Sequence, residues 1–178
     1  MQIQIKGLDK AIKDYKEYRD SLKNKLRTLM ERLAEIGIVT AELKLQTVVY
    51  DGTNDMKINS VPKWIDENKL AISAKGNSVA FIEFGTGVVY ADDHPKAADV
   101  GAIRGAYGKG KGKQTTWGYY GDPGTNGITI EKKKGKAKGK TVVLTHGNPA
   151  NRVLYDAGKE MRNQIVDIAR EVFMGDRS

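Results

Sequence analysis

The sequence has no cysteine, and this absence excludes three kinds of site at once. A chain of 178 residues without thiols has no disulfide, no thiolate zinc site and no cysteine nucleophile. Long apolar runs are missing as well, since nowhere do about 18 apolar residues follow one another. The first ten residues (MQIQIKGLDK) lack the basic and apolar regions of a secretory signal. We therefore expect a protein that neither crosses a membrane nor carries an export signal.

Histidine is almost as scarce, with two residues in the chain. His94 follows Asp92 and Asp93, but three adjacent residues seldom share one coordination sphere, so a solvated turn is favoured over a metal site. His146 stands just before the last predicted helix, where capping or packing is the favoured role. We expect no metal site from these residues.

The remaining polar residues show no catalytic arrangement. Glu83 lies in an apolar run and has no evident second carboxylate for paired acid and base chemistry. Residues 105–112 (GAYGKGKG) approach a phosphate-binding loop, but Gly112 stands where a Ser or Thr hydroxyl would hold magnesium. The sequence therefore predicts no catalytic residue and no cofactor, and we expect a protein that is not an enzyme.

The basic charge is concentrated in one part of the chain. The 30 Lys and Arg residues exceed the 22 Asp and Glu residues by 8, and residues 101–147 alone hold 10 basic and 2 acidic side chains. Lysines this dense repel one another, so we expect a solvated arm rather than a packed element. Its lysines are Lys132, Lys133, Lys134, Lys136, Lys138 and Lys140.

Two long amphipathic helices are predicted, near the two ends of the chain. After a short strand pattern at 2–5, the first helix has apolar residues spaced by three and four over 8–36, and residues 38–50 fit either helix or strand. The second is expected over about 149–174, with Asn148 as N-cap, Pro149 in the first position and Gly175 as C-terminal stop. The apolar faces that should pack include Leu22, Leu29, Leu154, Met161 and Ile165.

The middle of the chain predicts two hairpins separated by a long loop. Residues 70–74 and 79–84 alternate well enough for one hairpin, and residues 88–90 are compatible with a further strand. Residues 128–130 and 141–145 predict a second hairpin, whose tip is the lysine-rich stretch 131–140.

Residues 91–127 form the long predicted loop. They contain nine glycines and no sustained period, which is typical of a functional or disordered segment. Large aromatic side chains are costly to leave in water, so a loop that carries several of them favours docking onto a partner. The expected docking residues are Tyr107, Trp117, Tyr119 and Tyr120.

These elements predict one domain over residues 1–178 with an α+β fold. Two long amphipathic helices should pack on a small, mostly antiparallel sheet, with the glycine-rich aromatic loop and the lysine-rich hairpin outside the core. A helix as long as the first needs a partner along its whole apolar stripe. The second helix, a neighbouring copy, or both can supply it.

Three motifs carry a resemblance to a known family. They are VAFIEFGTG (79–87), WGYYG (117–121) and THGNPANRVLYDAGKEM (145–161), and the N-terminal IKGLDKAIKDY adds a strand, a glycine and a long helix. Together they resemble the tail-component, or tail-completion, proteins of long-tailed bacteriophages. Many members have P-x-D-T-G-x-L between first helix and sheet, and residues 50–70 lack this segment.

The resemblance implies a non-enzymatic virion protein at the neck, where tail joins head. Such a protein would act as an oligomeric ring around the DNA channel, hexameric if matched to the tail symmetry, in contact with neighbouring neck and tail proteins. It would lie close to DNA without reading its sequence, and would assemble in the cytoplasm of the bacterial host. Phe84, Gly85, Thr86 and Gly87 would shape a strand end and its turn, with glycine where a side chain does not fit.

The lysine-rich tip supports an alternative function. Six lysines can neutralise about six phosphates, so a nucleic-acid-binding protein without sequence preference is the second hypothesis. The same tip is also suited to an acidic protein surface, which we favour over DNA.

Overall fold

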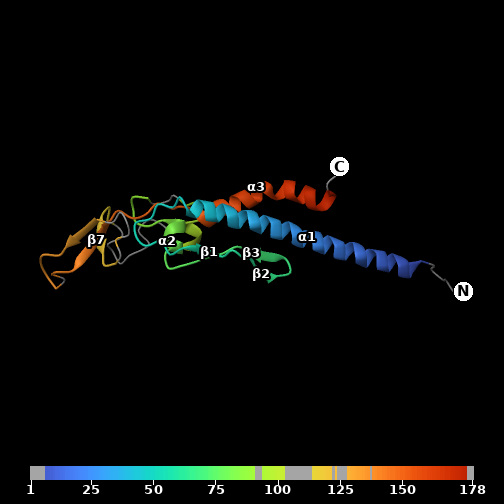
Figure 1. Cartoon of the computed structure of the whole chain (residues 1–178), viewed down its shortest axis with the longest axis horizontal. Coiled ribbons are helices and arrows are strands. Elements are labelled where there is room, and N and C mark those ends of the chain that lie inside the picture. The colour runs from blue at the N-terminus through green and yellow to red at the C-terminus, as the bar shows by residue number, and fades with distance from the viewer. Residues whose placement is uncertain are drawn as a thin grey trace.

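The computed structural model describes residues 7–90, 94–102, 114–121, 123, 128–136 and 138–175. The molecule is elongated, with a long helix at one end and a small sheet at the other (Figure 1). The predicted strand at 2–5 lies outside the described residues. The elements are the helices α1 (Leu8–Leu45), α2 (Val79–Phe84) and α3 (Val153–Met174), the 3-10 helix η1 (Ala98–Val100), and the strands β1 (Lys57–Ile58), β2 (Lys63–Asp66), β3 (Lys69–Ala71), β4 (Ala74–Lys75), β5 (Trp117–Tyr119), β6 (Ile128–Glu131) and β7 (Thr141–Thr145).

The fold is α+β, as predicted. Within the described residues the strands form three small antiparallel sheets, β1 with β4, β2 with β3, and the order β5-β7-β6. The prediction of the second hairpin is confirmed, because β6 and β7 pair with Glu131 opposite Thr141. The segment 117–119 is a strand of the same sheet, so this part of the predicted loop is ordered by hydrogen bonds to β7.

α1 is a single helix of 38 residues, which at about 1.5 Å per residue is about 57 Å long. Residues 38–45, which the sequence allows as helix or strand, are helical. Gly37 does not end the helix, although the sequence suggests a stop or kink there. It is buried against α3, and a Cβ at this position would lie 2.7 Å from the sulfur of Met161. The glycine therefore lets the two helices approach closely.

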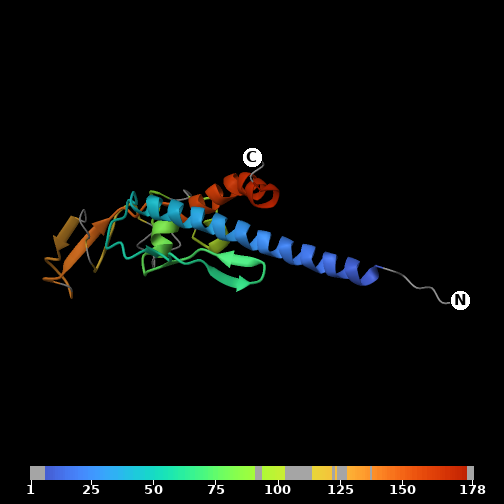
Figure 2. The same cartoon turned by 45° about the vertical axis from the view of Figure 1, so that its right-hand side comes forward.

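α3 runs antiparallel to α1 and covers its C-terminal part (Figure 1, Figure 2). Two ion pairs mark the register, Lys44 with Asp156 at 2.7 Å and Arg32 with Glu171 at 2.5 Å. These side chains are partly exposed, so each pair adds little stability and mainly fixes how the helices align. The N-terminal part of α1 extends beyond the end of α3 in both views.

α3 begins later than predicted. Its first residue is Val153, and Arg152 before it has a left-handed conformation with φ 54°, so Asn148 is not the N-cap and Pro149 is not in the first turn. The backbone of Asn148 pairs instead with that of Thr86, in both directions at 2.8 and 3.2 Å. These bonds hold the segment extended, which local capping preferences do not reveal. The predicted end of the helix at Gly175 is confirmed.

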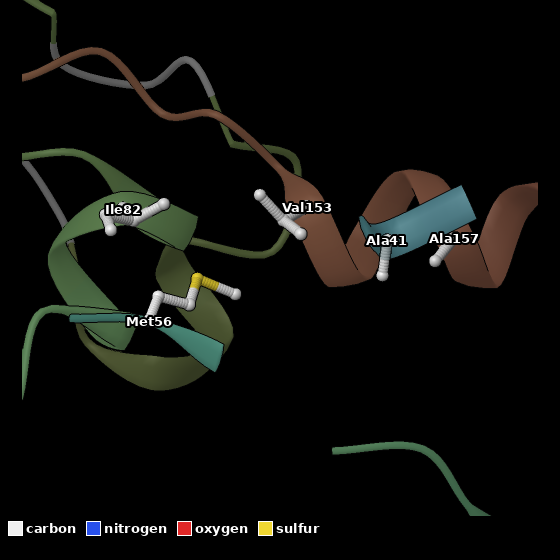
Figure 3. Packing of buried hydrophobic residues seen from close by; sticks show 5 residues of the cluster. All are labelled: Ala41, Met56, Ile82, Val153 and Ala157. Atoms are coloured by element: carbon white, nitrogen blue, oxygen red, sulfur yellow. The ribbon is translucent and has the colours of Figure 1, made fainter. Parts of the chain in front are cut away.

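The core lies where α1, α2 and α3 meet. Its buried cluster is Ala41, Met56, Ile82, Val153 and Ala157 (Figure 3). Small side chains on the helices bring the backbones together, while Met56 and Ile82 fill the space beside them. Of the residues predicted to pack between helices, Leu29 is buried, Leu22, Leu154 and Met161 are half-buried, and Ile165 is 43% exposed.

Residues 79–84 form the helix α2, so the predicted hairpin of residues 70–74 with 79–84 is wrong. β3 pairs with β2, and β4 pairs with β1. A run of six mostly apolar residues fits a buried helical turn as well as a strand, and periodicity does not distinguish the two. Gly85 to Gly87 therefore follow a helix, and residues 88–90 form turns rather than a strand.

The Asp55 carboxylate holds the start of α2. It accepts hydrogen bonds from the backbone N–H groups of Asn77 and Ser78, each at 2.8 Å, and from the Ser78 hydroxyl. The Ser78 hydroxyl, followed by the two backbone groups, holds the pKa of Asp55 well below its ordinary value of 3.8. The charged form of Asp55 is therefore the one that stabilises the fold.

The buried Glu83 carboxylate caps α3. The backbone N–H groups of Leu154 and Tyr155 donate to it at 2.8 and 2.9 Å, where the helix dipole favours a negative charge. His94 is also buried, with Nε2 at 3.2 Å from Glu83 Oε1, and its ring packs against Phe84 and Tyr155. The predicted solvated turn at His94 is therefore wrong, because this side chain belongs to the interior.

We expect Glu83→Gln to lower the free energy of unfolding by about 1–3 kcal/mol. The amide retains one acceptor oxygen, so one of the two N–H groups of α3 is left without a partner. Urea denaturation followed by circular dichroism measures the change. Glu35→Gln, on the exposed face of α1, is the control and should stay within about 0.5 kcal/mol of the parent. Equal losses in both variants would contradict the capping role.

The lowered pKa of Asp55 predicts that part of the free energy of unfolding is lost at acidic pH. Because its pKa is lower in the folded than in the unfolded chain, its contribution is present above pH 3.8 and is lost as the pH falls below that value. Asp55→Asn should therefore unfold more easily than the parent at pH 7, and the difference should shrink below pH 4. Urea midpoints measured from pH 7 to pH 3 test this, and a difference independent of pH would exclude the role of the charge.

Candidate functional site

Three segments that are far apart in the sequence meet at one junction. They are the turn after α2 (residues 84–87), the strand β5 with the residues after it (117–121), and the segment between β7 and α3 (146–152). These are the segments on which the family resemblance rests.

Glycines permit this meeting. A Cβ on Gly85 would lie 2.7 Å from the backbone nitrogen of Ala150, and a Cβ on Gly87 would lie 2.7 Å from the ring of Trp117. Both glycines have positive φ, at 73° and 87°, which other residues rarely adopt. In the turn Phe84, Gly85, Thr86 and Gly87, the two glycines thus stand where no side chain fits. This turn follows a helix and not the strand that the sequence predicts.

Two asparagines tie the end of α1 to the junction. The backbone N–H of Asp51 donates to the side-chain oxygen of Asn148 at 2.5 Å. The side chain of Asn151 bonds to Val49 in both directions, accepting from its N–H at 2.9 Å and donating to its carbonyl at 3.0 Å. The segment after α1 is therefore held in place by side chains from the start of the α3 segment.

A cavity of about 380 Å³ opens at the junction. Four aromatic side chains from three segments line it: Tyr50 after α1, Phe81 in α2, and Trp117 and Tyr119 in β5. The polar lining comes from residues of the same turns, namely Asp51, Thr53, Thr86, Thr145 and Asn148. An aromatic wall with a few polar groups is the usual character of a binding site for an organic group.

The cavity has an acidic character. Asp51 is the charged side chain among its described lining residues, and no basic side chain of the described chain lines it. Burial raises the pKa of the Tyr50 phenol above 10.0, and the phenol of Tyr119 and the carboxylate of Asp55 raise it further. The environment of Tyr50 therefore resists additional negative charge.

The predicted docking residues have different positions. Trp117 and Tyr119 are half-buried in the cavity wall, so they contact their own chain. The sequence instead predicts them in a loop whose aromatic side chains bind a partner. Tyr120 is 58% exposed beside them. Tyr107 lies outside the described residues, as do Asp92 and Asp93.

The sequence did not point to Tyr50 or Asp51 as parts of this site. They follow α1 in a segment that fits helix or strand, and no spacing links them to β5, which is more than 60 residues further along the chain. Glu83 and His94 are a second pair that was missed. The oxygens of Glu83 are occupied by the N–H groups of α3, so this pair acts as a structural cap.

A second candidate surface lies on α1. Its N-terminal part has large apolar side chains that are 44% to 66% exposed. They continue the stripe that is buried at Leu29, and the N-terminal part of α1 projects beyond the end of α3 (Figure 2). We call this surface the α1 stripe. It consists of Leu8, Ile12, Tyr15, Tyr18 and Leu26.

A third candidate surface is the basic tip, residues 131–140, which connects β6 to β7. Its backbone is ordered by hydrogen bonds from Lys132 N–H to the Lys140 carbonyl at 3.0 Å and from Gly139 N–H to the Lys132 carbonyl at 2.9 Å. The hairpin projects at the end of the molecule opposite the N-terminus (Figure 1). All six of its lysines are exposed: Lys132, Lys133, Lys134, Lys136, Lys138 and Lys140.

Two features are absent from the part of the chain that the structure describes. Within the described residues, no three or more His, Asp or Glu side chains gather in a way that would hold a metal ion. None of the helices in the described part of the chain has the length and apolar character needed to cross a bilayer.

The chain was compared with protein-family models, with curated proteins and with solved structures. No family model, no curated protein and no solved structure matches it.

Proposed function

We propose that this chain is a non-enzymatic structural protein of a phage virion. It completes the head-proximal end of the tail and joins the tail to the head, as one subunit of an oligomeric ring around the DNA channel. The observation that carries the proposal is the α1 stripe. The three motifs that resemble tail-completion proteins add support, because they all lie at one junction of the fold.

The α1 stripe has the chemistry of an assembly surface. Burial of each large apolar side chain contributes about 1.5–3 kcal/mol, and exposing several of them in a row is unusual for a monomer. The folded chain itself covers the same stripe at Leu29, which is buried. A neighbouring subunit is the natural cover for the part that projects.

The arrangement of the surfaces favours a ring. The apolar α1 stripe is at one end of the elongated molecule and the basic tip is at the other (Figure 1). Copies with different surfaces at their two ends associate head to tail, and such contacts close into rings when the rotation allows. A ring of identical subunits is the form that a connector around DNA requires.

We expect the double variant Tyr15→Ser with Tyr18→Ser to weaken self-association at least tenfold while the monomer stays folded. Both side chains are exposed in the single chain, at 66% and 64%, so their loss removes contacts to a partner and not to the core. Sedimentation velocity over a range of concentrations measures the assembly, and electron microscopy of the protein alone and with purified tails reports ring symmetry and location.

Glu17→Ser is the control for this variant. Glu17 is exposed on the opposite face of the same helix turn, so its replacement tests the effect of serine without touching the stripe. It should assemble like the parent. A parent chain that stays monomeric at all concentrations, and that does not join tails, would overturn the proposal.

The basic tip favours a second candidate function, binding of nucleic acid without sequence preference. Six exposed lysines on an ordered hairpin can neutralise about six phosphates of a nucleic-acid backbone. The absence of base-reading motifs in the sequence limits such binding to the phosphates.

Under this second function, log affinity against log salt for duplex DNA should have a slope of about −5. Replacing the six tip lysines with glutamine should bring the slope close to zero. A matched variant with Lys10, Lys13, Lys16 and Lys23 changed to glutamine on α1 should keep most of it. Fluorescence anisotropy at several salt concentrations makes the measurement, and an unchanged slope, or no DNA binding by the parent, excludes this function.

A further inference from the structure

The aromatic cavity at the junction is not used by the contacts proposed so far. Its wall combines the rings of Tyr50, Phe81, Trp117 and Tyr119 with the carboxylate of Asp51. Trp117 is held in place because its ring packs against Gly87 and Gly147, so this part of the wall is formed before any ligand arrives.

A cation is the ligand class that this wall favours. Aromatic faces attract ammonium groups through the ring quadrupole, and the attraction grows as the site excludes water. The acidic lining adds to this, since Asp51 is negative and no basic side chain among the described residues lines the cavity. Burial raises the pKa of the Tyr50 phenol most, and the Tyr119 phenol and the Asp55 carboxylate raise it further. An anionic ligand would meet repulsion there.

The chain itself presents a concentrated source of ammonium groups, the basic tip. Within one chain the tip and the cavity are separated along β7. Thr145, at the end of β7, lines the cavity, whereas the tip precedes Thr141 at the start of the same strand. We therefore take the tip of a neighbouring copy as the source of the ammonium group.

We propose that the aromatic cavity binds a lysine side chain from the basic tip of a second copy of this chain. The proposal rests on the self-association of the proposed function, and it adds a specific contact to it. The tip of one subunit enters the cavity of the next, with the lysine ammonium against the rings and near Asp51. The donor and acceptor surfaces differ, so the contact is compatible with head-to-tail association in a ring.

The test titrates the full-length protein with a peptide copying residues 131–140 (EKKKGKAKGK), with calorimetry as the readout. A peptide in which every lysine is glutamine is the matched ligand control. Asp51→Asn should weaken binding of the lysine peptide about tenfold, whereas Asp14→Asn, an exposed carboxylate on α1, should leave it unchanged. The glutamine peptide should not bind.

Two variants of Tyr50 separate ring chemistry from simple packing. Tyr50→Phe keeps the aromatic face and should bind the peptide like the parent. Tyr50→Leu keeps apolar bulk without the face and should weaken binding about tenfold. Circular dichroism of each variant checks that the fold is retained. Equal binding of the lysine and glutamine peptides, or binding unaffected by both Asp51→Asn and Tyr50→Leu, would overturn the proposal.

The outcome is distinguishable from failure of the proposed function. If the Tyr15 and Tyr18 double variant loses assembly but titrates normally with the peptide, the stripe and the lysine site are two separate contacts between subunits. If the parent forms rings that Asp51→Asn leaves intact and the peptide does not bind, the proposed ring is supported and the proposed lysine site is excluded. A parent that is always monomeric removes the second copy as the source of the lysine, whatever the peptide does.

Discussion

One buried carboxylate determines how the parts of this molecule are placed. Glu83 satisfies two N–H groups at the start of α3, and it does so from the last turn of α2. This fixes the direction in which the chain leaves α2, and therefore the turn at Gly85 that meets Ala150. Without an acceptor at this point, the first N–H groups of α3 would be buried without partners, which is costly. The aromatic cavity exists because this junction is closed.

The stability of the single chain and its assembly depend on different parts of α1. The C-terminal part supplies Ala41 to the core and is covered by α3. The N-terminal part is exposed and adds no core contact of its own, and an isolated helical stretch of this length is marginal in water. Its helix therefore continues one that tertiary packing already stabilises further along. Side chains of the α1 stripe are free to match a partner, since the core does not constrain them.

Sequence patterns predicted the elements with regular spacing and misjudged those decided by distant contacts. The first helix, the lysine-tipped hairpin and the end of α3 at Gly175 follow from periodicity and turn residues. The segment 79–84 fits a strand because five of its six residues are apolar, but Asp55 accepts hydrogen bonds at its start and the segment forms the helix α2. The cavity was not predictable for the same reason. Tyr50 lines the cavity with Trp117 and Tyr119 because the tertiary structure places the segment after α1 beside β5, and no sequence spacing indicates this.

The charge of the two ends limits how copies associate. Two basic tips repel each other, since each has six lysines and one glutamate, so a symmetric contact of tip with tip is disfavoured. The α1 stripe is also flanked by more basic than acidic residues, which disfavours a contact between the stripes of two copies. Both surfaces are better matched by a different part of a neighbour: an apolar face for the stripe and an acidic aromatic site for the tip. Such unlike pairs are compatible with the head-to-tail contacts from which rings are built.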